Sequence, residues 1–157
     1  MYHNKKYIKW GGHMDYKKDC EERLRRYAKA EETLELLNKR LEKASMHGKP
    51  ADLSAIDFSK IGHSNMSKDA LDELIEVQHI LKQIHNIESE KEIIDKVLKN
   101  IKNDNKENYN FIQLKYIQDI PMNIVAEKLG YSDTSNKTIY KIKDRALKNF
   151  SLYFWGE

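Results

Sequence analysis

Apolar residues recur at intervals of three and four along most of this 157-residue chain, which is the spacing of amphipathic α-helices. Residues 14–45 carry two such series with a period of seven, and Lys, Arg and Glu fill most of the remaining positions. The first series is Tyr27, Leu34 and Leu41, and the second is Ala30, Leu37 and Ala44. Together they form an apolar stripe that needs a helical partner. We therefore predict one long amphipathic helix over residues 14–45.

A second long helix is predicted over residues 67–102, with Ser67 as its N-cap and Asp69 near the positive end of its dipole. Its apolar stripe also has a period of seven. The members of the stripe are Ile80, Ile87, Ile94 and Ile101, with Val77, Ile84 and Leu98 beside them. The two long helices can pack as an antiparallel hairpin, or they can form a coiled coil with a second copy, which would make a homodimer.

Shorter elements are predicted around these helices. Residues 46–66 contain Gly and Pro and lack periodicity, which predicts a connector, with one turn of helix in residues 51–56. The polar run 103–108 predicts a loop, and the apolar residues of 109–117 predict a short helix after it. The aromatic tail 152–155 is expected to fold back on the core or to dock on a partner, since an exposed apolar cluster usually marks an interface.

Residues 114–150 predict two helices joined by a turn. The first runs from Pro121 to Leu129, because proline is favoured at a helix start and Gly130 can end it in the left-handed conformation. The turn, residues 131–136, is rich in Ser, Thr, Asp and Asn, which cap helices. The second helix starts at residue 136 or 137 and has two unlike faces. One face holds Ile139, Ile142, Ala146 and Phe150, and the other holds Lys137, Lys141, Asp144, Arg145 and Lys148.

The charge of this second helix suggests a partner. From Lys137 to Lys148, four lysines and one arginine stand against Asp144, a net charge of +4. A lysine-rich helix in a bundle often only faces water. Here it follows a short helix and a capped turn, which is the layout of a helix-turn-helix whose second helix enters the major groove of DNA.

The distribution of charge along the chain is uneven. Residues 1–13 carry +3, residues 14–89 carry −2 (13 basic, 15 acidic) and residues 90–157 carry +2 (12 basic, 10 acidic). The positive charge therefore lies at the two ends. The total of +3 is by itself too small to indicate nucleic-acid binding.

Residues 116–147 resemble the promoter-recognition helix-turn-helix of bacterial sigma factors, their fourth region. Residues 124–132, IVAEKLGYS, stand where that family has EIA-x-x-LG-x-S, and residues 138–140, TIY, stand where it has T-V-x. Residues 145–147, RAL, match the R-A-L that follows in the family. One departure is that five residues separate Ser132 from Thr138, more than the usual spacing, so the turn is longer or the recognition helix begins earlier. The resemblance covers the C-terminal third well and the middle only loosely.

Sigma-like regulators of phage late genes, of the ArpU and RinA types, are similar at these residues, vary in this turn and carry a helical region ahead of it. The resemblance implies an all-α regulator of phage or prophage type that binds double-stranded DNA in the bacterial cytoplasm. It also implies contact with RNA polymerase. In this interpretation residues 103–157 form the helix-turn-helix domain, buttressed by residues 90–102, because a helix-turn-helix has too little apolar surface to fold alone.

The predicted DNA-contacting residues lie at the start and on the polar face of the second helix. They are Ser135, Asn136, Lys137, Thr138, Tyr140, Lys141, Asp144, Arg145 and Lys148. Asn pairs bidentately with adenine and Arg or Lys with guanine, whereas Thr and Tyr can touch a phosphate or a thymine methyl. Lys143 and Lys148 are expected mostly at the DNA backbone. Arg145 has a second interpretation, as an ion pair at the edge of the core.

Composition supports a helical protein, with 39% hydrophobic and 34% charged residues and two prolines. The single cysteine, Cys20, excludes a disulfide within the chain and fits a reducing cytoplasm. No apolar run has the length of a membrane span or the character of a signal peptide. Residues 1–13 mix lysines with aromatic residues and predict a flexible arm. They can also be a translated leader, and we favour this second interpretation, because the codons for residues 10–14 would resemble a ribosome-binding site before the start codon of Met14.

No catalytic or metal-binding constellation is found, and we predict no cofactor and no enzyme activity. The six histidines are scattered, and His79 and His85 lack the i,i+4 spacing of a zinc pair. Two other classes of function stay open besides transcription regulation. A phage small terminase subunit also combines a helix-turn-helix with coiled-coil helices, and a helical protein-interaction module would bind no DNA. A true group sigma factor is the third alternative. It would need a minus-ten-recognising domain rich in aromatic residues ahead of the helical hairpin, and we expect no such domain here unless residues 14–101 are a degenerate version of it.

Overall fold

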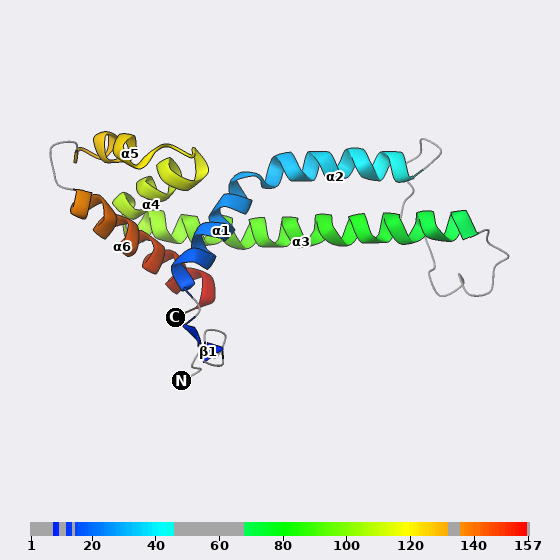
Figure 1. The fold of residues 1–157 in the computed structure, drawn as a ribbon, viewed down its shortest axis with the longest axis horizontal. Coiled ribbons are helices and arrows are strands. Elements are labelled where there is room, and N and C mark those ends of the chain that lie inside the picture. The colour runs from blue at the N-terminus through cyan, green and yellow to red at the C-terminus, as the bar shows by residue number, and fades with distance from the viewer. Residues whose placement is uncertain (1–7, 10–11, 14, 46–67, 132–135, 157) are drawn as a thin grey trace. The chain divides into compact units, whose positions relative to one another are not determined.

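The computed structural model describes residues 8–9, 12–13, 15–45, 68–131 and 136–156. The all-α class is confirmed, because helices account for nearly all of these residues. Two-residue strands, β1 (Ile8–Lys9) and β2 (Gly12–His13), pair antiparallel within the predicted arm. The helices are α1 (Tyr16–Ala28), α2 (Ala30–Ala44), α3 (Lys68–Asp104), α4 (Lys106–Ile112), the π-helix η4 (Gln113–Ile117), α5 (Met122–Lys128) and α6 (Asn136–Trp155) (Figure 1).

The chain divides into two compact units. Unit 1 comprises residues 1–29 and 90–157, and unit 2 comprises residues 30–89, so that α3 has residues in both. None of the helices in the described ranges is long and apolar enough to cross a membrane.

The single helix predicted over residues 14–45 is wrong in one respect, because the structure has two helices that meet at Lys29. At this residue the N–H donates back to the Arg26 carbonyl at 3.1 Å, which ends α1. The segment contains neither Gly nor Pro, so the sequence gives no sign of the break. The break coincides with the division between the units: Cys20 and Leu24 are fully buried in the core of unit 1, whereas Ala30 belongs to unit 2.

In unit 2, α2 runs beside the first part of α3 in the opposite direction (Figure 1). Arg40 of α2 pairs with Glu76 of α3 at 3.3 Å. The buried residues in the described ranges of unit 2 come from the predicted stripes, and they are Ala30, Val77, Ile80 and Ile84. The predicted connector over residues 46–66, including the helical turn 51–56, and the predicted cap Ser67 lie outside the described residues.

The loop predicted over residues 103–108 is also wrong. Helix α3 continues to Asp104, and only Asn105 separates it from α4. The Asn105 side chain accepts a hydrogen bond of 3.1 Å from the backbone N–H of Asn108, which makes it the N-cap of α4. Polar residues that looked like a loop therefore form a cap and a helical first turn. The helix predicted over residues 109–117 consequently starts three residues earlier and ends as the π-helix η4.

One buried cluster in unit 1 joins residues of α1, α3, α4, η4, α5 and α6. The fully buried members with the largest side chains are Leu24, Ile94, Ile101, Phe111, Ile112, Val125, Leu147 and Phe150. This cluster holds α6 by one face along most of its length, so the opposite face is left at the surface.

Candidate nucleic-acid interface

Helix α5 ends in a Schellman motif, as the position of Gly130 predicts. The Tyr131 N–H donates to the Ala126 carbonyl at 2.8 Å, and the Gly130 N–H donates to the Glu127 carbonyl at 3.0 Å. Gly130 has a φ of 86°, a conformation that glycine adopts without strain. The motif fixes the direction in which the chain leaves α5 toward α6. Pro121 is the N-cap of α5 rather than its first helical residue, one position from the prediction.

Helix α6 begins at Asn136, where the sequence places it, and continues to Trp155, beyond the predicted end at residue 150. The predicted apolar face is buried, and it consists of Ile139, Ile142, Ala146 and Phe150. The aromatic tail extends this packing, since Phe154 stacks on Phe150 with ring centroids 5.5 Å apart. The Arg23 guanidinium of α1 lies 4.7 Å from the Phe154 ring centroid. Leu152 and Tyr153 stay partly exposed, so only part of the tail folds back on the core.

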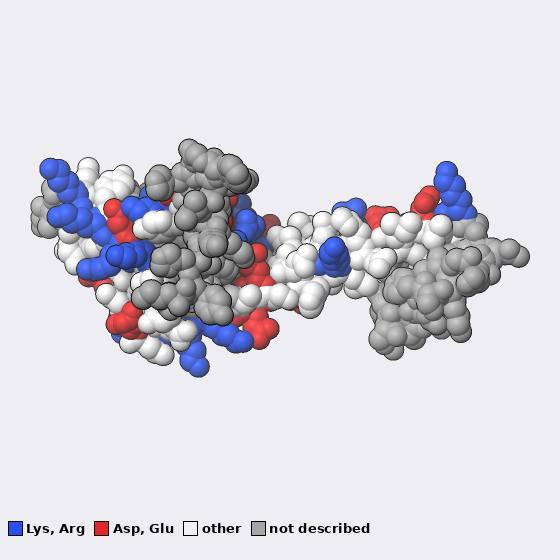
Figure 2. All heavy atoms as spheres, turned by 90° about the horizontal axis from the view of Figure 1, so that it is seen from below, with Lys and Arg blue, Asp and Glu red and all other residues white. Residues whose placement is uncertain are grey.

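The opposite face of α6 is exposed and basic. Lys137, Lys141 and Lys148 are exposed, and within the described ranges none of the three pairs with an acidic side chain. Asn136 and Tyr140 are exposed beside them, and Thr138 is partly buried. The predicted contact Ser135 lies outside the described residues. Figure 2 shows Lys and Arg side chains gathered at the end of unit 1 where α6 begins.

Three charged residues of α6 already have partners in the protein. Asp144 accepts from the Lys17 ammonium of α1 at 2.9 Å, and Lys143 pairs with Glu21 of α1 at 3.1 Å. Arg145 pairs with Glu107 of α4. The sequence allowed two interpretations of Arg145, as a DNA contact and as part of an ion pair at the edge of the core. The structure contains the ion pair, with Glu107. Lys143 likewise braces α6 against α1 and does not extend freely into solvent.

The partners of Arg145 form a small polar network. The Arg145 Nε donates to the side-chain oxygen of Asn108 at 3.0 Å, and the Tyr131 hydroxyl donates to Glu107 at 2.8 Å. This hydrogen bond to Glu107 also raises the pKa of Tyr131. Nothing in the sequence marked Glu107 or Asn108 as partners, because they lie 38 and 37 residues from Arg145.

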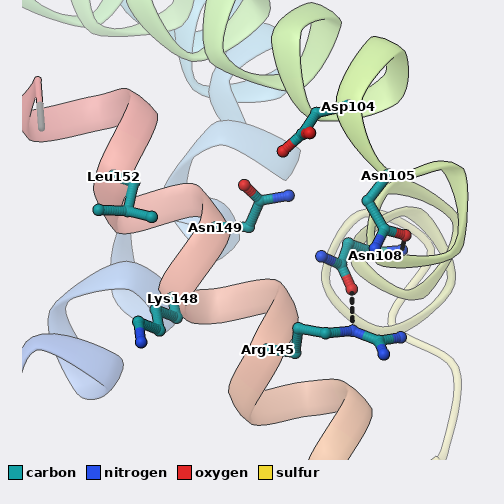
Figure 3. Close-up of a pocket in the computed structure, with 7 residues that line it drawn as sticks. All are labelled: Asp104, Asn105, Asn108, Arg145, Lys148, Asn149 and Leu152. Carbon is teal, nitrogen blue, oxygen red and sulfur yellow. Dashed lines mark hydrogen bonds between the residues drawn. The ribbon is translucent and has the colours of Figure 1, made fainter.

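A shallow pocket of about 260 Å³ lies beside this network. Its lining residues are Asp104, Asn105, Asn108, Arg145, Lys148, Asn149 and Leu152. Figure 3 shows Arg145 reaching across to Asn108 and the Asn149 amide turned toward Asp104. The lining mixes a carboxylate, amides and cations, so it defines no single class of small-molecule ligand. The described residues also contain no cluster of His, Cys, Asp and Glu suited to a metal ion.

Two interior groups of unit 1 have shifted pKa values. Burial raises the pKa of the Cys20 thiol to about 12, and the thiol donates weakly to the Leu147 carbonyl at 3.8 Å. Burial, followed by the charge of Glu21, raises the pKa of Tyr116. Both groups are far from accessible, which makes them core residues rather than parts of a reactive site.

Comparison of the chain with protein-family models, with curated proteins and with solved structures found no match in any of the three.

Proposed function

We propose that this protein is a sequence-specific DNA-binding regulator of transcription, in which α5, Gly130 and α6 act as a helix-turn-helix. The observation that carries the proposal is the division of α6 into a buried apolar face and an exposed face with three lysines that have no acidic partner in the part of the chain that the structure describes. An α-helix held in this way fits the major groove, where its first turns reach the base edges.

Each exposed group of α6 has a role in this proposal. Asn136, Thr138 and Tyr140 lie within the first two turns, where they would meet base edges or the flanking phosphates. Lys137, Lys141 and Lys148 would neutralise phosphates and give the binding its dependence on salt. Arg145 would contribute indirectly, by holding α6 against α4.

Part of the resemblance to sigma region four lies at residues that pack α6 against the rest of unit 1. Of the residues 145–147 that match its R-A-L segment, Ala146 and Leu147 are fully buried and Arg145 is paired with Glu107. This part of the resemblance therefore concerns how the helix is packed. This packing supports a helix-turn-helix fold. Recognition of a promoter and contact with RNA polymerase are proposed from the resemblance alone.

The test is a salt titration of binding to AT-rich duplex DNA, followed by fluorescence anisotropy. We expect the affinity of the unmodified protein to fall steeply with salt. The double variant Lys137→Ala/Lys141→Ala should reduce the slope of log K against log salt by about 2, since each lost phosphate contact removes about 0.9.

A matched control is the double variant Lys39→Ala/Lys96→Ala, which removes the same charge from lysines paired with Glu35 and Glu92 on α2 and α3. It should leave the slope nearly unchanged. If both double variants reduce the slope of log K against log salt equally, binding depends only on net charge. Absence of binding at low salt would refute the helix-turn-helix proposal. In the latter case a protein-interaction module becomes the better interpretation.

A further inference from the structure

Helix α1 packs against α6 in unit 1, although the two are separated by more than a hundred residues of sequence. Four contacts join the two helices: Lys17 to Asp144 at 2.9 Å, Lys143 to Glu21 at 3.1 Å, the Cys20 thiol to the Leu147 carbonyl at 3.8 Å, and the Arg23 guanidinium over the Phe154 ring. The N-terminal end of α1 is thereby placed beside the middle of α6.

Asp144 is the one acidic residue between Lys137 and Lys148, and it lies on the exposed side of α6 with 56% of its side chain accessible. A carboxylate in this position would repel the phosphates that the neighbouring lysines attract. The Lys17 ammonium, with 36% of its side chain accessible, neutralises that charge. The basic face of α6 is therefore completed by a cation from another helix.

We propose that the DNA-binding surface extends from α6 onto α1, with Lys17 as a phosphate-contacting residue that Asp144 holds in place. This inference rests on the proposed function. A lysine ammonium has three donors, so Lys17 can keep its bond to Asp144 while donating to a phosphate oxygen. The pair would thus position a flexible lysine side chain before DNA arrives, which lowers the entropy lost on binding.

The neighbouring Lys18 offers a matched control. It has the same charge and lies on the same turn of α1, but it is exposed and has no acidic partner among the described residues. One residue along a helix is a rotation of about 100°, so Lys18 points away from the direction of Lys17. Its removal changes net charge equally without changing the proposed surface.

The experiment compares four variants of the full chain, Lys17→Ala, Lys17→Arg, Lys18→Ala and Asp144→Asn, by salt titration of duplex DNA binding and by thermal unfolding. We expect Lys17→Ala to lower the salt slope by about 0.9 and Lys18→Ala to leave it unchanged. Lys17→Arg should restore the slope. Asp144→Asn should bind DNA more tightly, because removal of the repelling carboxylate outweighs the loss of its hold on the Lys17 side chain, whose charge stays.

A different pattern would overturn the inference. If Lys17 only braces α1 against α6, Lys17→Ala and Asp144→Asn will both lower the melting temperature while the salt slope stays that of the unmodified protein. That outcome is distinguishable from failure of the proposed function, because the Lys137→Ala/Lys141→Ala variant would still lose slope. Failure of the function itself would appear as absence of binding by the unmodified chain.

Discussion

The Nε of Arg145 donates a hydrogen bond of 3.0 Å to the side-chain oxygen of Asn108, which is only 2% exposed. The same guanidinium pairs with Glu107, and Glu107 accepts a hydrogen bond from the hydroxyl of Tyr131. Because Tyr131 directly follows Gly130, this network connects α6, α4 and the end of α5. Arg145 therefore fixes the helix that carries the candidate interface.

The variant Arg145→Ala should lower the free energy of unfolding by about 1–2 kcal/mol, since it leaves the buried Asn108 side chain without its donor. Arg145→Lys should not restore the loss, because lysine cannot bond both partners in the geometry of a guanidinium. Urea denaturation measures the change. Lys148→Ala, on the same helix, is the control and should stay within about 0.5 kcal/mol of the unmodified protein. Equal stability of both alanine variants would contradict the structural role of Arg145.

Tyr116 provides a second test of the core. Its hydroxyl is buried and makes no hydrogen bond of normal length and angle among the described residues, although the Glu21 carboxylate lies close enough to raise its pKa. Its ring packs edge-on against Phe111 with centroids 6.2 Å apart. An unsatisfied buried polar group costs about 1–3 kcal/mol. Tyr116→Phe should therefore raise the free energy of unfolding by about 1 kcal/mol, and Tyr116→Ala should lower it by about 3 kcal/mol because it leaves a cavity. Destabilisation by Tyr116→Phe in urea would show that the hydroxyl is satisfied.

The turn after α5 can be tested at Gly130. An added Cβ would meet no atom within 4 Å, so the cost of a substitution comes from the backbone alone. With a φ of 86°, Gly130→Ala should lose about 1 kcal/mol of stability. Gly130→Asn should lose less, because asparagine tolerates the left-handed region. Thermal unfolding of the two variants gives the comparison, and equal melting temperatures would speak against the left-handed conformation.

Asp119 is the non-glycine residue in the described ranges that has a positive φ, 53°. It follows η4, where the Ile120 N–H donates to the Leu114 carbonyl at 3.0 Å. Asp119→Gly should relieve the backbone strain of the left-handed conformation, but glycine also loses more conformational entropy on folding. The net result should be a rise of about 0.5 kcal/mol in the free energy of unfolding. Asp119→Ala should lower it. Chemical denaturation at neutral pH distinguishes the two, and the reverse order would contradict the expected strain.

Much of this fold could be predicted from periodicity. The seven-residue series predicted the C-terminal residue of α3 to within two positions, and six of the seven residues in the predicted stripe are buried. The 3.6-residue period likewise separated the two faces of α6, since Ile139 and Ile142 are buried and Lys137 and Lys141 exposed. Side-chain direction on a helix follows from position alone, so such assignments do not require knowledge of the fold.

Junctions between helices and long-range pairs could not be predicted in this way. The junction at Lys29 contains no Gly or Pro that would predict the end of a helix. Asn105 lies in a polar run that resembles a loop, but it is an N-cap because its side chain accepts a hydrogen bond within the first turn of α4. The pair between Lys17 and Asp144 joins residues 127 positions apart, which only the packing of α1 on α6 brings together. Local patterns contain no information on such distances, and for this reason the sequence suggested Asp144 as a free contact.

The buried thiol of Cys20 gives the protein a specific sensitivity to alkaline pH. Burial raises its pKa from 9.0 to about 12, so above about pH 9 the unfolded chain binds fewer protons than the folded one. The free energy of unfolding should therefore fall as pH rises from about 9 to about 12, by at most about 1.4 kcal/mol per pH unit for this group. Cys20→Ala removes this titration and leaves that of Tyr116, whose pKa is also raised by burial, so its stability should fall less steeply. Urea denaturation of both proteins over this range measures the two slopes. Identical slopes would mean that Cys20 ionises as readily in the folded protein as in the unfolded chain.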